Sequence, residues 1–318
     1  MRAIVYYGNG SSDILKLVDL DQPTPADDEV LIKVQAASVN PLDWRMMRGG
    51  PAIFRLLDRG PKMKRPGVDV AGVVEAVGKN VTRFKPADAV FGAAAGSFSE
   101  YACGEESKLA PKPESISFED AASIPIAGVT ALQALGDNGK IAAGSKVLIN
   151  GAAGGVGIFA VQIAKLFGAE VTGVCSARNL DFVKSLGADR VIDYTREDFT
   201  QTSERYDILF DNMGNHPLRA YRRILKPKGR CVIVGGPKSM WVILERLARA
   251  AVLSCFVSQK LGMMLARIKS DDLARIAEMM QSGKVKAVID RRYSLREVPD
   301  AMRYGEEGHT RGKVVIVP

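Results

Sequence analysis

The sequence predicts an α/β protein that combines a β-rich, barrel-like domain with a doubly wound parallel sheet. In the first hundred residues, apolar and polar positions alternate and prolines and glycines recur, as is typical of strands joined by irregular loops. From Lys146 onward, short apolar strands alternate with helical segments, which indicates a parallel sheet buried on both faces. The length of 318 residues fits about two domains.

The first domain begins with strand patterns. Residues 30–36 alternate between apolar and polar side chains, which is the period of a half-buried strand. Residues 68–77 form a second β-rich run, and Gly72 within it indicates a bulge or the close approach of another backbone segment. Together these runs predict a small barrel-like sheet.

The second domain follows a change in pattern. Ser117 and Asp120 predict a capped helix start. Further on, strands are predicted at 146–150, 171–174, 190–193, 206–211 and 230–234, and helices at 155–167 and 179–186. The end of the chain mixes a helix beginning at Ser270 with strands at 285–289 and 313–317, and we expect it to fold back onto the first domain. The predicted domains are therefore residues 1–122 with 268–318, and residues 123–267.

The composition restricts the classes of partner. An apolar fraction of 47% and a charged fraction of 25% are those of an ordinary globular protein. The formal charge of +8 favours anionic partners, but the densest basic cluster, Lys62, Lys64 and Arg65, is too short to predict nucleic acid binding. No run of about 18 apolar residues predicts a membrane span.

The cysteines indicate a reducing compartment. Cys103, Cys175, Cys231 and Cys255 stand far apart without a C-x-x-C pair, which argues against a zinc knuckle, a redox dithiol or a disulfide framework. The chain opens on a strand pattern rather than on a secretory signal. We therefore expect a cytoplasmic protein.

The most apolar region, residues 240–268, has two interpretations. Trp241, Leu244, Ala248 and Ala251 recur at helical spacing, while Arg249 lies on another face. We prefer a helix packed on its own domain or on a subunit partner. The alternative is a helix that lies on a membrane surface.

A glycine-rich turn lies between the predicted strand 146–150 and the predicted helix 155–167. It fits A-x-G-x-x-G, with Ala152 in place of the first glycine and with Gly154 and Gly157 at the other two positions. Glycines let a pyrophosphate approach the backbone, and the helix N-terminus offers it free N–H groups and a positive dipole end. The turn therefore predicts a dinucleotide site.

The next strand decides which dinucleotide is expected. A site for NAD places Asp or Glu about 20 residues after the glycines, where the carboxylate holds the ribose 2′-hydroxyl. Here Ser176 and Arg178 follow the strand, and Arg178 can bind a 2′-phosphate with two hydrogen bonds. Tyr194 follows the third strand and either lines the adenosine or packs locally. The predicted cofactor is NADPH.

Five segments carry a resemblance to a known family: residues 37–43, 67–78, 128–135, 150–157 and 312–316. Over essentially its whole length the chain resembles the medium-chain dehydrogenases/reductases, in particular their zinc-free quinone oxidoreductase (zeta-crystallin-like) branch. The resemblance implies a GroES-like β-barrel domain, a Rossmann domain, an active site in the cleft between them, and a homodimer. It implies cofactor contacts at Asn40, Thr130, Gly151, Ala152, Gly154, Gly155, Val156, Ser176, Arg178, Tyr194, Gly235 and Lys313.

The residues argue against a metal. In zinc-dependent relatives a cysteine and a histidine bind the catalytic zinc, whereas the corresponding positions here carry Asn40 and Val68. The chain has only His216 and His309, which lie in unrelated contexts. The sequence therefore predicts no metal site.

The expected reaction is hydride transfer from NADPH to a quinone or an α,β-unsaturated carbonyl. Asn40, or a water held by Asp43, is expected to donate a hydrogen bond to the developing oxyanion. The alternative is that Asn40 caps a turn and Asp43 binds local backbone. An apolar substrate wall and core packing are alternative roles for Trp44, Met46, Met47 and Phe54.

Two other functions stay open. One is a protein that binds NADPH without turnover. The other is a membrane-surface adaptor that uses the segment 240–268.

Overall fold

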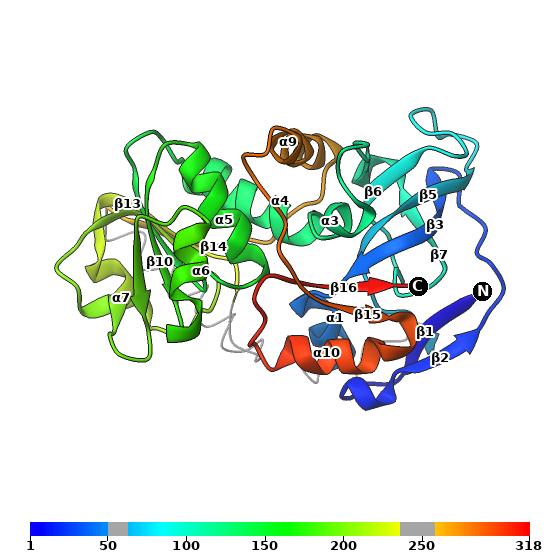
Figure 1. Cartoon of the computed structure of the whole chain (residues 1–318), viewed down its shortest axis with the longest axis horizontal. Helices are drawn as coiled ribbons and strands as arrows, with labels where there is room; N and C mark the ends of the chain where they lie inside the picture. Colours follow the sequence, from blue (N-terminus) through cyan, green and yellow to red (C-terminus); the bar gives the residue numbers. More distant parts are fainter. Residues whose placement is uncertain (50–62, 236–257) are drawn as a thin grey trace. The chain divides into compact units, whose positions relative to one another are not determined.

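The computed structural model describes residues 1–49, 63–235 and 258–318. The chain divides into two compact units, Met1–Val129 with Ile268–Pro318, and Thr130–Arg267 (Figure 1). The boundary that the sequence predicts, between residues 122 and 123, stays a prediction. The helix that ends there, α3 (Phe118–Ala122), packs on strands of the first unit and begins at Ser117, whose hydroxyl accepts the Asp120 N–H at 3.0 Å.

The first unit is built on a seven-stranded sheet of order β15-β16-β3-β5-β6-β8, in which β7 also pairs with β3. A three-stranded sheet of order β2-β1-β4 accompanies it among the described residues. The strands are β1 (Arg2–Tyr7), β2 (Lys16–Asp19), β3 (Glu29–Ser38), β4 (Met63–Lys64), β5 (Asp69–Val77), β6 (Ala89–Ala93), β7 (Tyr101–Glu105), β8 (Leu109–Pro111), β15 (Ile289–Ser294) and β16 (Lys313–Val317). The helices are α1 (Pro41–Met47), α3, α4 (Pro125–Gln133, which runs on into the second unit), α9 (Ser270–Gln281) and α10 (Val298–Glu306).

Strand register brings the end of the chain beside its beginning. β3 pairs antiparallel with β5, and Ser38 lies opposite Asp69. β16 pairs antiparallel with β3 on its other side, and Val315 lies opposite Ser38. Two residues further along, this register places Lys313 across from Asn40. Ser38, Asn40, Asp69 and Lys313 therefore meet at one end of three adjacent strands.

In the part of the second unit that the structure describes, six strands form one sheet of order β11-β10-β9-β12-β13-β14, with every adjacent pair parallel. Its strands are β9 (Lys146–Asn150), β10 (Glu170–Cys175), β11 (Arg190–Asp193), β12 (Tyr206–Asp211), β13 (Leu225–Ile233) and β14 (Lys260–Met263). Among its described residues, the helices α5 (Gly155–Leu166), α6 (Leu180–Ser185) and α7 (Leu218–Arg223) pack on the strands (Figure 1). The strand order reverses at β9, and the carboxyl ends of strands at such a reversal are where ligands bind in open α/β sheets.

The sheet interior confirms the apolar strand pattern of the second unit. Val147, Leu148 and Ile149 of β9 are fully buried, as are Leu209 and Phe210 of β12. Full burial of consecutive residues requires helices on both faces of a sheet. The predicted α/β fold class with a parallel sheet is confirmed.

Two stretches differ from the sequence predictions. The strand expected at 285–289 begins instead at Ile289 and runs to Ser294, because pairing with β16 rather than local hydrophobicity defines it. Residues 260–263 of the apolar region form a strand, β14, which pairs with β13 and lies at the edge of the sheet as far as the described residues extend. The helical spacing from Trp241 to Ala251 lies outside the described residues, as does Phe54.

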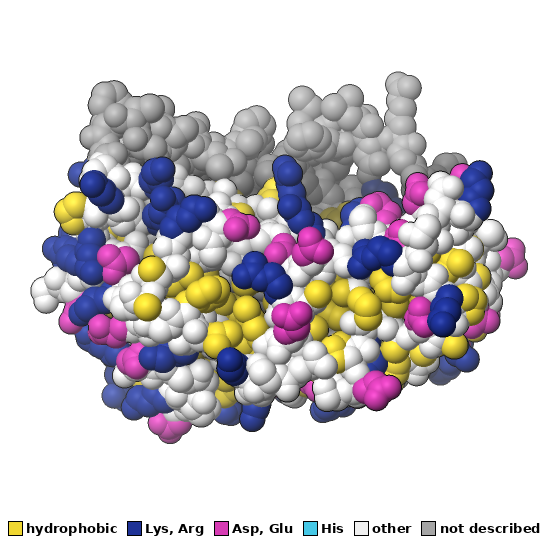
Figure 2. Space-filling view, turned by 90° about the horizontal axis from the view of Figure 1, so that it is seen from above, with side chains coloured by type: hydrophobic (Ala, Val, Ile, Leu, Met, Phe, Trp, Pro, Cys, Tyr) yellow, Lys and Arg dark blue, Asp and Glu magenta, His cyan; other side chains and the backbone are white. Residues whose placement is uncertain are grey.

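Charge is dispersed over the face drawn in Figure 2. Lysine and arginine side chains alternate there with aspartate and glutamate, without gathering into one stripe. Among the described residues, no helix is long and apolar enough to cross a membrane.

Candidate functional site

Backbone geometry requires glycine at two positions of the turn between β9 and α5. Gly151 has φ +84°, in the left-handed region that favours glycine. A β-carbon on Gly157 would lie 2.2 Å from the Gly151 carbonyl oxygen. The N–H groups of Gly151 and Ala152 donate to the Val174 carbonyl at 3.1 and 3.0 Å, which fixes the turn on β10.

The turn leaves the start of α5 open. Gly154 is the N-cap of this 12-residue helix, and a β-carbon on it would have no heavy atom nearer than 3.6 Å. The first N–H groups of a helix have no acceptor within the helix, and Gly154 has no side chain to supply one. The open space at Gly154 and the N–H groups of Gly155, Val156 and Gly157 fit a pyrophosphate.

Ala152 stands where the fingerprint has its first glycine, and the structure shows how the additional methyl group is accommodated. Its methyl group is fully buried. A β-carbon on Gly173 of β10 would lie 3.1 Å from the Ala152 β-carbon and 2.6 Å from Val183 Cγ1. Gly173 thus provides the space that the extra methyl occupies. The sequence analysis did not identify Gly173, because a glycine inside an apolar strand gives no local sign of the residue that it faces.

The carboxyl ends of β9 and β12 are joined by a buried amide–carboxylate pair. Asn150 Nδ2 donates to Asp211 Oδ1 at 2.8 Å and to Asn215 Oδ1 at 2.9 Å. Asp211 also accepts the Gly214 N–H at 3.0 Å. A β-carbon on Gly235 would lie 1.8 Å from the Asn212 carbonyl oxygen, so glycine is required there as well. The predicted contact Gly235 follows β13 and packs directly against the backbone that follows β12.

The residues predicted to select NADPH lie at the ends of β10 and β11. Ser176 is half-buried and Arg178 is exposed. The Tyr194 N–H donates to the Cys175 carbonyl at 3.1 Å, which places Tyr194 beside Ser176, and its ring is exposed. Asp193, at the end of β11, accepts the Thr195 N–H and hydroxyl at 3.0 and 2.8 Å, and these hydrogen bonds lower the pKa of Asp193.

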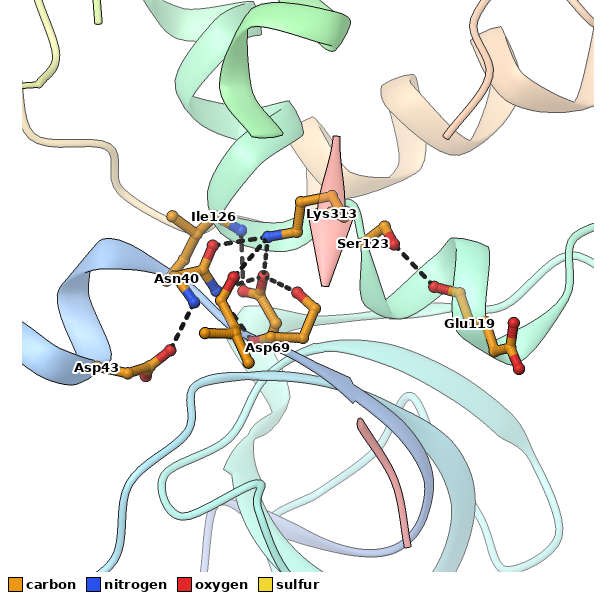
Figure 3. A network of polar contacts seen from close by, with 9 residues as sticks. Asn40, Asp43, Asp69, Glu119, Ser123, Ile126 and Lys313 are labelled. Carbon is orange, nitrogen blue, oxygen red and sulfur yellow. Dashed lines mark hydrogen bonds and ion pairs between the residues drawn. The ribbon is translucent and has the colours of Figure 1, made fainter. Parts of the chain in front are cut away.

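In the first unit, the predicted residues Asn40 and Lys313 both contact the carboxylate of Asp69 (Figure 3). Asp69 Oδ2 accepts hydrogen bonds from Asn40 Nδ2 and from the Ser38 hydroxyl, each at 2.8 Å, and pairs with Lys313 Nζ at 3.4 Å. Asn40 Oδ1 accepts a hydrogen bond from Lys313 Nζ at 2.7 Å. The sequence comparison did not single out Asp69, although it lies in the segment 67–78.

The network occupies both amide hydrogens of Asn40. One is donated to Asp69 and the other to the Ser38 carbonyl at 3.2 Å. The expected donation to an oxyanion therefore requires that the Ser38 contact be given up. Lys313 Nζ likewise faces acceptors, and burial lowers the pKa of Lys313 while Asp69 and Asp43 oppose that effect.

Asp43 caps the helix that follows Asn40. Its Oδ2 accepts the Asn40 N–H at 2.7 Å, as the local alternative in the sequence predicts. Its other oxygen, Oδ1, is buried and has no hydrogen-bond partner. The nearby Gly67 N–H stabilises the negative charge of the carboxylate and so acts to lower the pKa of Asp43. Burial raises the pKa of Asp43 to about 7, and the charge of Asp69 adds to the rise.

The remaining predicted residues divide between core and surface. Thr130 is buried in α4. Met47 belongs to the fully buried core of the first unit, Trp44 packs against that core, and Met46 is exposed, so these three do not form one wall. His216 contacts the Phe199 ring edge-on, and no group of three or more His, Cys, Asp or Glu side chains among the described residues could hold a metal ion.

Comparison with known proteins gives the family. Residues 26–114 match the alcohol dehydrogenase GroES-like domain, and residues 186–316 match the zinc-binding dehydrogenase family. The chloroplast envelope quinone oxidoreductase homolog of Arabidopsis thaliana is 35% identical over 100% of this chain and 98% of its own. The NADPH-dependent alkenal/one oxidoreductase of the same plant, also chloroplastic, is 35% identical over 100% of this chain and 80% of its own.

A solved structure agrees over the full length. The quinone oxidoreductase from Coxiella burnetii has a TM-score of 0.88 and 33% identity, and the match covers 100% of this chain and 99% of that one. The predicted GroES-like and Rossmann folds are therefore confirmed.

The expected cytoplasmic location is contradicted by the same comparison. Relatives that match the whole chain are named for the chloroplast, and others for the mitochondrion. Unpaired cysteines indicate a reducing environment, and that property does not separate one reducing compartment from another.

The family assignment rests on identity above 30% across the whole chain together with the fold and the glycine turn. The chain belongs to the medium-chain dehydrogenase/reductase superfamily, in its quinone oxidoreductase branch.

Proposed function

We propose that this protein is an NADPH-dependent oxidoreductase that reduces a quinone or an α,β-unsaturated carbonyl. The observation that carries the proposal is the turn between β9 and α5. The Gly151 carbonyl lies too close to position 157 for any residue other than glycine, while the space at Gly154 is open. Relatives that span the chain are named as a quinone oxidoreductase and as an NADPH-dependent alkenal/one oxidoreductase, which supports both the cofactor and the substrate class.

The proposed cofactor contacts divide between the two units. In the second unit, the backbone of Gly151, Ala152, Gly154, Gly155 and Val156 binds the pyrophosphate. Ser176 and Arg178 bind the 2′-phosphate, Tyr194 lies along the adenosine, and Gly235 allows the loop after β13 to approach the backbone after β12. Thr130 in α4, and Asn40 and Lys313 in the first unit, complete the set.

The reduction consumes one hydride and one proton. NADPH, when bound, supplies the hydride. We place the proton on Asp43, because its buried Oδ1 has no hydrogen-bond partner and its pKa of about 7 lets the carboxyl carry a proton at neutral pH. Asn40 and Lys313 supply the fixed dipole and positive charge beside it.

The reaction needs no zinc in this proposal. Asn40, with an amide rather than a thiolate, is committed to Asp69 and Lys313, and His216 packs against Phe199. Neither side chain is offered to a metal ion. We also propose a homodimer: among the described residues β14 is an edge strand of the parallel sheet, and such an edge readily pairs with a second copy. Light scattering on the eluted protein tests the homodimer, and a monomer across the working concentration range refutes it.

The test of function begins with cofactor binding. Isothermal calorimetry with NADPH and NADH, on wild type and Arg178→Ala, is expected to show tight NADPH binding that falls towards the NADH value in the variant. Equal affinity for both cofactors, unchanged by the substitution, refutes the NADPH assignment.

A substrate panel follows. We expect NADPH oxidation with a quinone or an enal, and none with simple saturated aldehydes. Tight NADPH binding without turnover over the whole panel favours the non-catalytic alternative. The adaptor alternative depends on Trp241 and Arg249, which lie outside the described residues, and is not proposed.

A further inference from the structure

Asp69 accepts four donors from three separate segments of the first unit. Its Oδ2 accepts Ser38 at the end of β3, Asn40 before α1 and Lys313 at the start of β16. Its Oδ1 accepts the Ile126 N–H in the first turn of α4 at 3.0 Å. Figure 3 shows Asn40, Lys313 and Ile126 around the Asp69 carboxylate.

Stability alone does not account for this arrangement. Asp69 is fully buried and Lys313 is 3% exposed. Removing two charges from water costs about as much as their attraction returns, so well-packed apolar residues at such a pair are often equally stable. A buried ion pair with several further hydrogen bonds is therefore better explained by what it holds in place.

The pair holds the Asn40 amide in one orientation. Lys313 requires the amide oxygen to face it, and Asp69 requires the amide nitrogen. The reversed amide would set its N–H groups against the ammonium and its oxygen against the carboxylate. Both partners thus select the same orientation from opposite ends.

Asp69 also fixes the helix that carries Thr130. A carboxylate in the first turn of a helix is favoured by the free N–H groups and the dipole there. Ile126, whose N–H Asp69 accepts, precedes Thr130 by one helical turn in α4. Asn40, Lys313 and Thr130 are proposed above to contact NADPH. Asp69 contacts the first two side chains directly and binds the Ile126 N–H of the helix that carries the third.

We propose that Asp69 is a positioning residue of the cofactor site, which fixes Asn40, Lys313 and the start of α4 for NADPH without touching it. This inference rests on the proposed function, because it takes those three residues as NADPH contacts. It predicts that removing the carboxylate weakens cofactor binding through Lys313 and Asn40.

A double-mutant cycle tests it, with calorimetric NADPH affinity and the melting temperature measured for wild type, Asp69→Asn, Lys313→Met and the double variant. We expect each single variant to bind NADPH about tenfold more weakly, and the double variant to lose clearly less than the product of the two losses. The double variant buries no unpaired charge, so it is expected to melt near the wild-type temperature while still binding NADPH weakly.

The control is Ser38→Ala, which removes one donor from Asp69 and leaves Asn40 and Lys313 in place. We expect it to keep NADPH affinity within about twofold of wild type. Losses that multiply in the double variant, or a double variant that binds NADPH like wild type, overturn the proposal. If Asp69→Asn does not fold, the comparison of Lys313→Met with the double variant still decides: a further loss clearly smaller than tenfold supports action through Lys313 and Asn40 together, whereas no further loss, or a full tenfold further loss, overturns the proposal.

Failure of the proposed function gives a different result. Wild type that binds no NADPH refutes the cofactor assignment and this inference together. Wild type that binds NADPH but reduces no quinone or enal refutes the activity alone, and the binding cycle still tests Asp69.

Discussion

The Gly157 α-carbon lies so close to the Gly151 carbonyl oxygen that a β-carbon at position 157 would be 2.2 Å from it. The same turn holds a contrasting glycine, since a β-carbon on Gly154 would have 3.6 Å to its nearest neighbour. One glycine is required by the fold and the other by what approaches from outside. Substitutions at the two positions separate these requirements.

Gly157→Ala is expected to lower both stability and NADPH affinity, because the turn must shift to admit the methyl, and overpacking of this kind costs about 1–3 kcal/mol. Gly154→Ala is expected to lower the melting temperature less than Gly157→Ala does, by the small cost of alanine at an N-cap, and to weaken NADPH binding about tenfold, since the methyl fills the space of the pyrophosphate. Thermal unfolding and calorimetry measure the two effects. Unchanged affinity in Gly154→Ala shows that no phosphate approaches there.

Ser176→Asp is expected to reverse the cofactor preference towards NADH. A carboxylate at this position accepts a ribose 2′-hydroxyl and repels a 2′-phosphate. Ser176→Ala is the matched control, because it removes the hydroxyl without adding charge. The ratio of NADPH to NADH affinity should fall steeply in Ser176→Asp and only slightly in Ser176→Ala. A ratio that falls equally in both variants places the 2′-phosphate elsewhere.

Asp43 is expected to make stability depend on pH. Its pKa is raised in the folded protein to about 7 by burial and by Asp69, with Lys313 and the N–H groups of Asn40 and Gly67 opposing the rise. The folded state therefore binds more protons than the unfolded state, and the stability from this group is lost as pH rises from about 4 to about 7. The slope is at most about 1.4 kcal/mol per pH unit.

Urea unfolding at pH 5 and pH 8 checks this dependence. Wild type should lose more stability between the two values than Asp43→Asn, which carries no titrating group at that position. The same slope in both proteins indicates that Asp43 is charged throughout. For the reduction itself, the wild-type rate should fall above pH 7 as Asp43 loses its proton.

Gly173→Ala is expected to destabilise the second unit by about 1–3 kcal/mol, because its methyl would meet Val183 and the Ala152 methyl. Combining it with Ala152→Gly should recover part of the loss, since one of the two contacts is relieved. Denaturant unfolding of the two single variants and the double variant measures this coupling. Strictly additive changes indicate that Ala152 and Gly173 do not share space.

Local sequence pattern predicts the second unit well and the network of the first unit poorly. The glycine turn can be recognised from the sequence because Gly151, Gly154 and Gly157 lie within one strand–turn–helix segment. Asp69 meets Asn40 from 29 residues away and Lys313 from 244 residues away. That meeting depends on the register of β3 with β5 and β16, which local periodicity does not specify.

The predicted strand boundary near the end of the chain is wrong, because pairing with a neighbouring strand, rather than local hydrophobicity, decides which residues form the strand. The segment 285–289 is apolar enough to suggest a strand, yet Val285 is buried outside the sheet. The strand itself, Ile289–Ser294, is largely polar and is defined by its partner β16. The hypothesis that Asp43 binds local backbone agrees with the structure, because the Asn40 N–H that Asp43 accepts lies only three residues away in the sequence.

The pairing of Ala152 with Gly173 bears on how such chains are found. A search that demands glycine at the first position of G-x-G-x-x-G passes over this protein, although its turn has the required geometry. A pattern that accepts alanine there when the next strand carries glycine at the facing position would retrieve it. The two positions should then vary together among relatives, with the larger residue on one side matched by the smaller on the other.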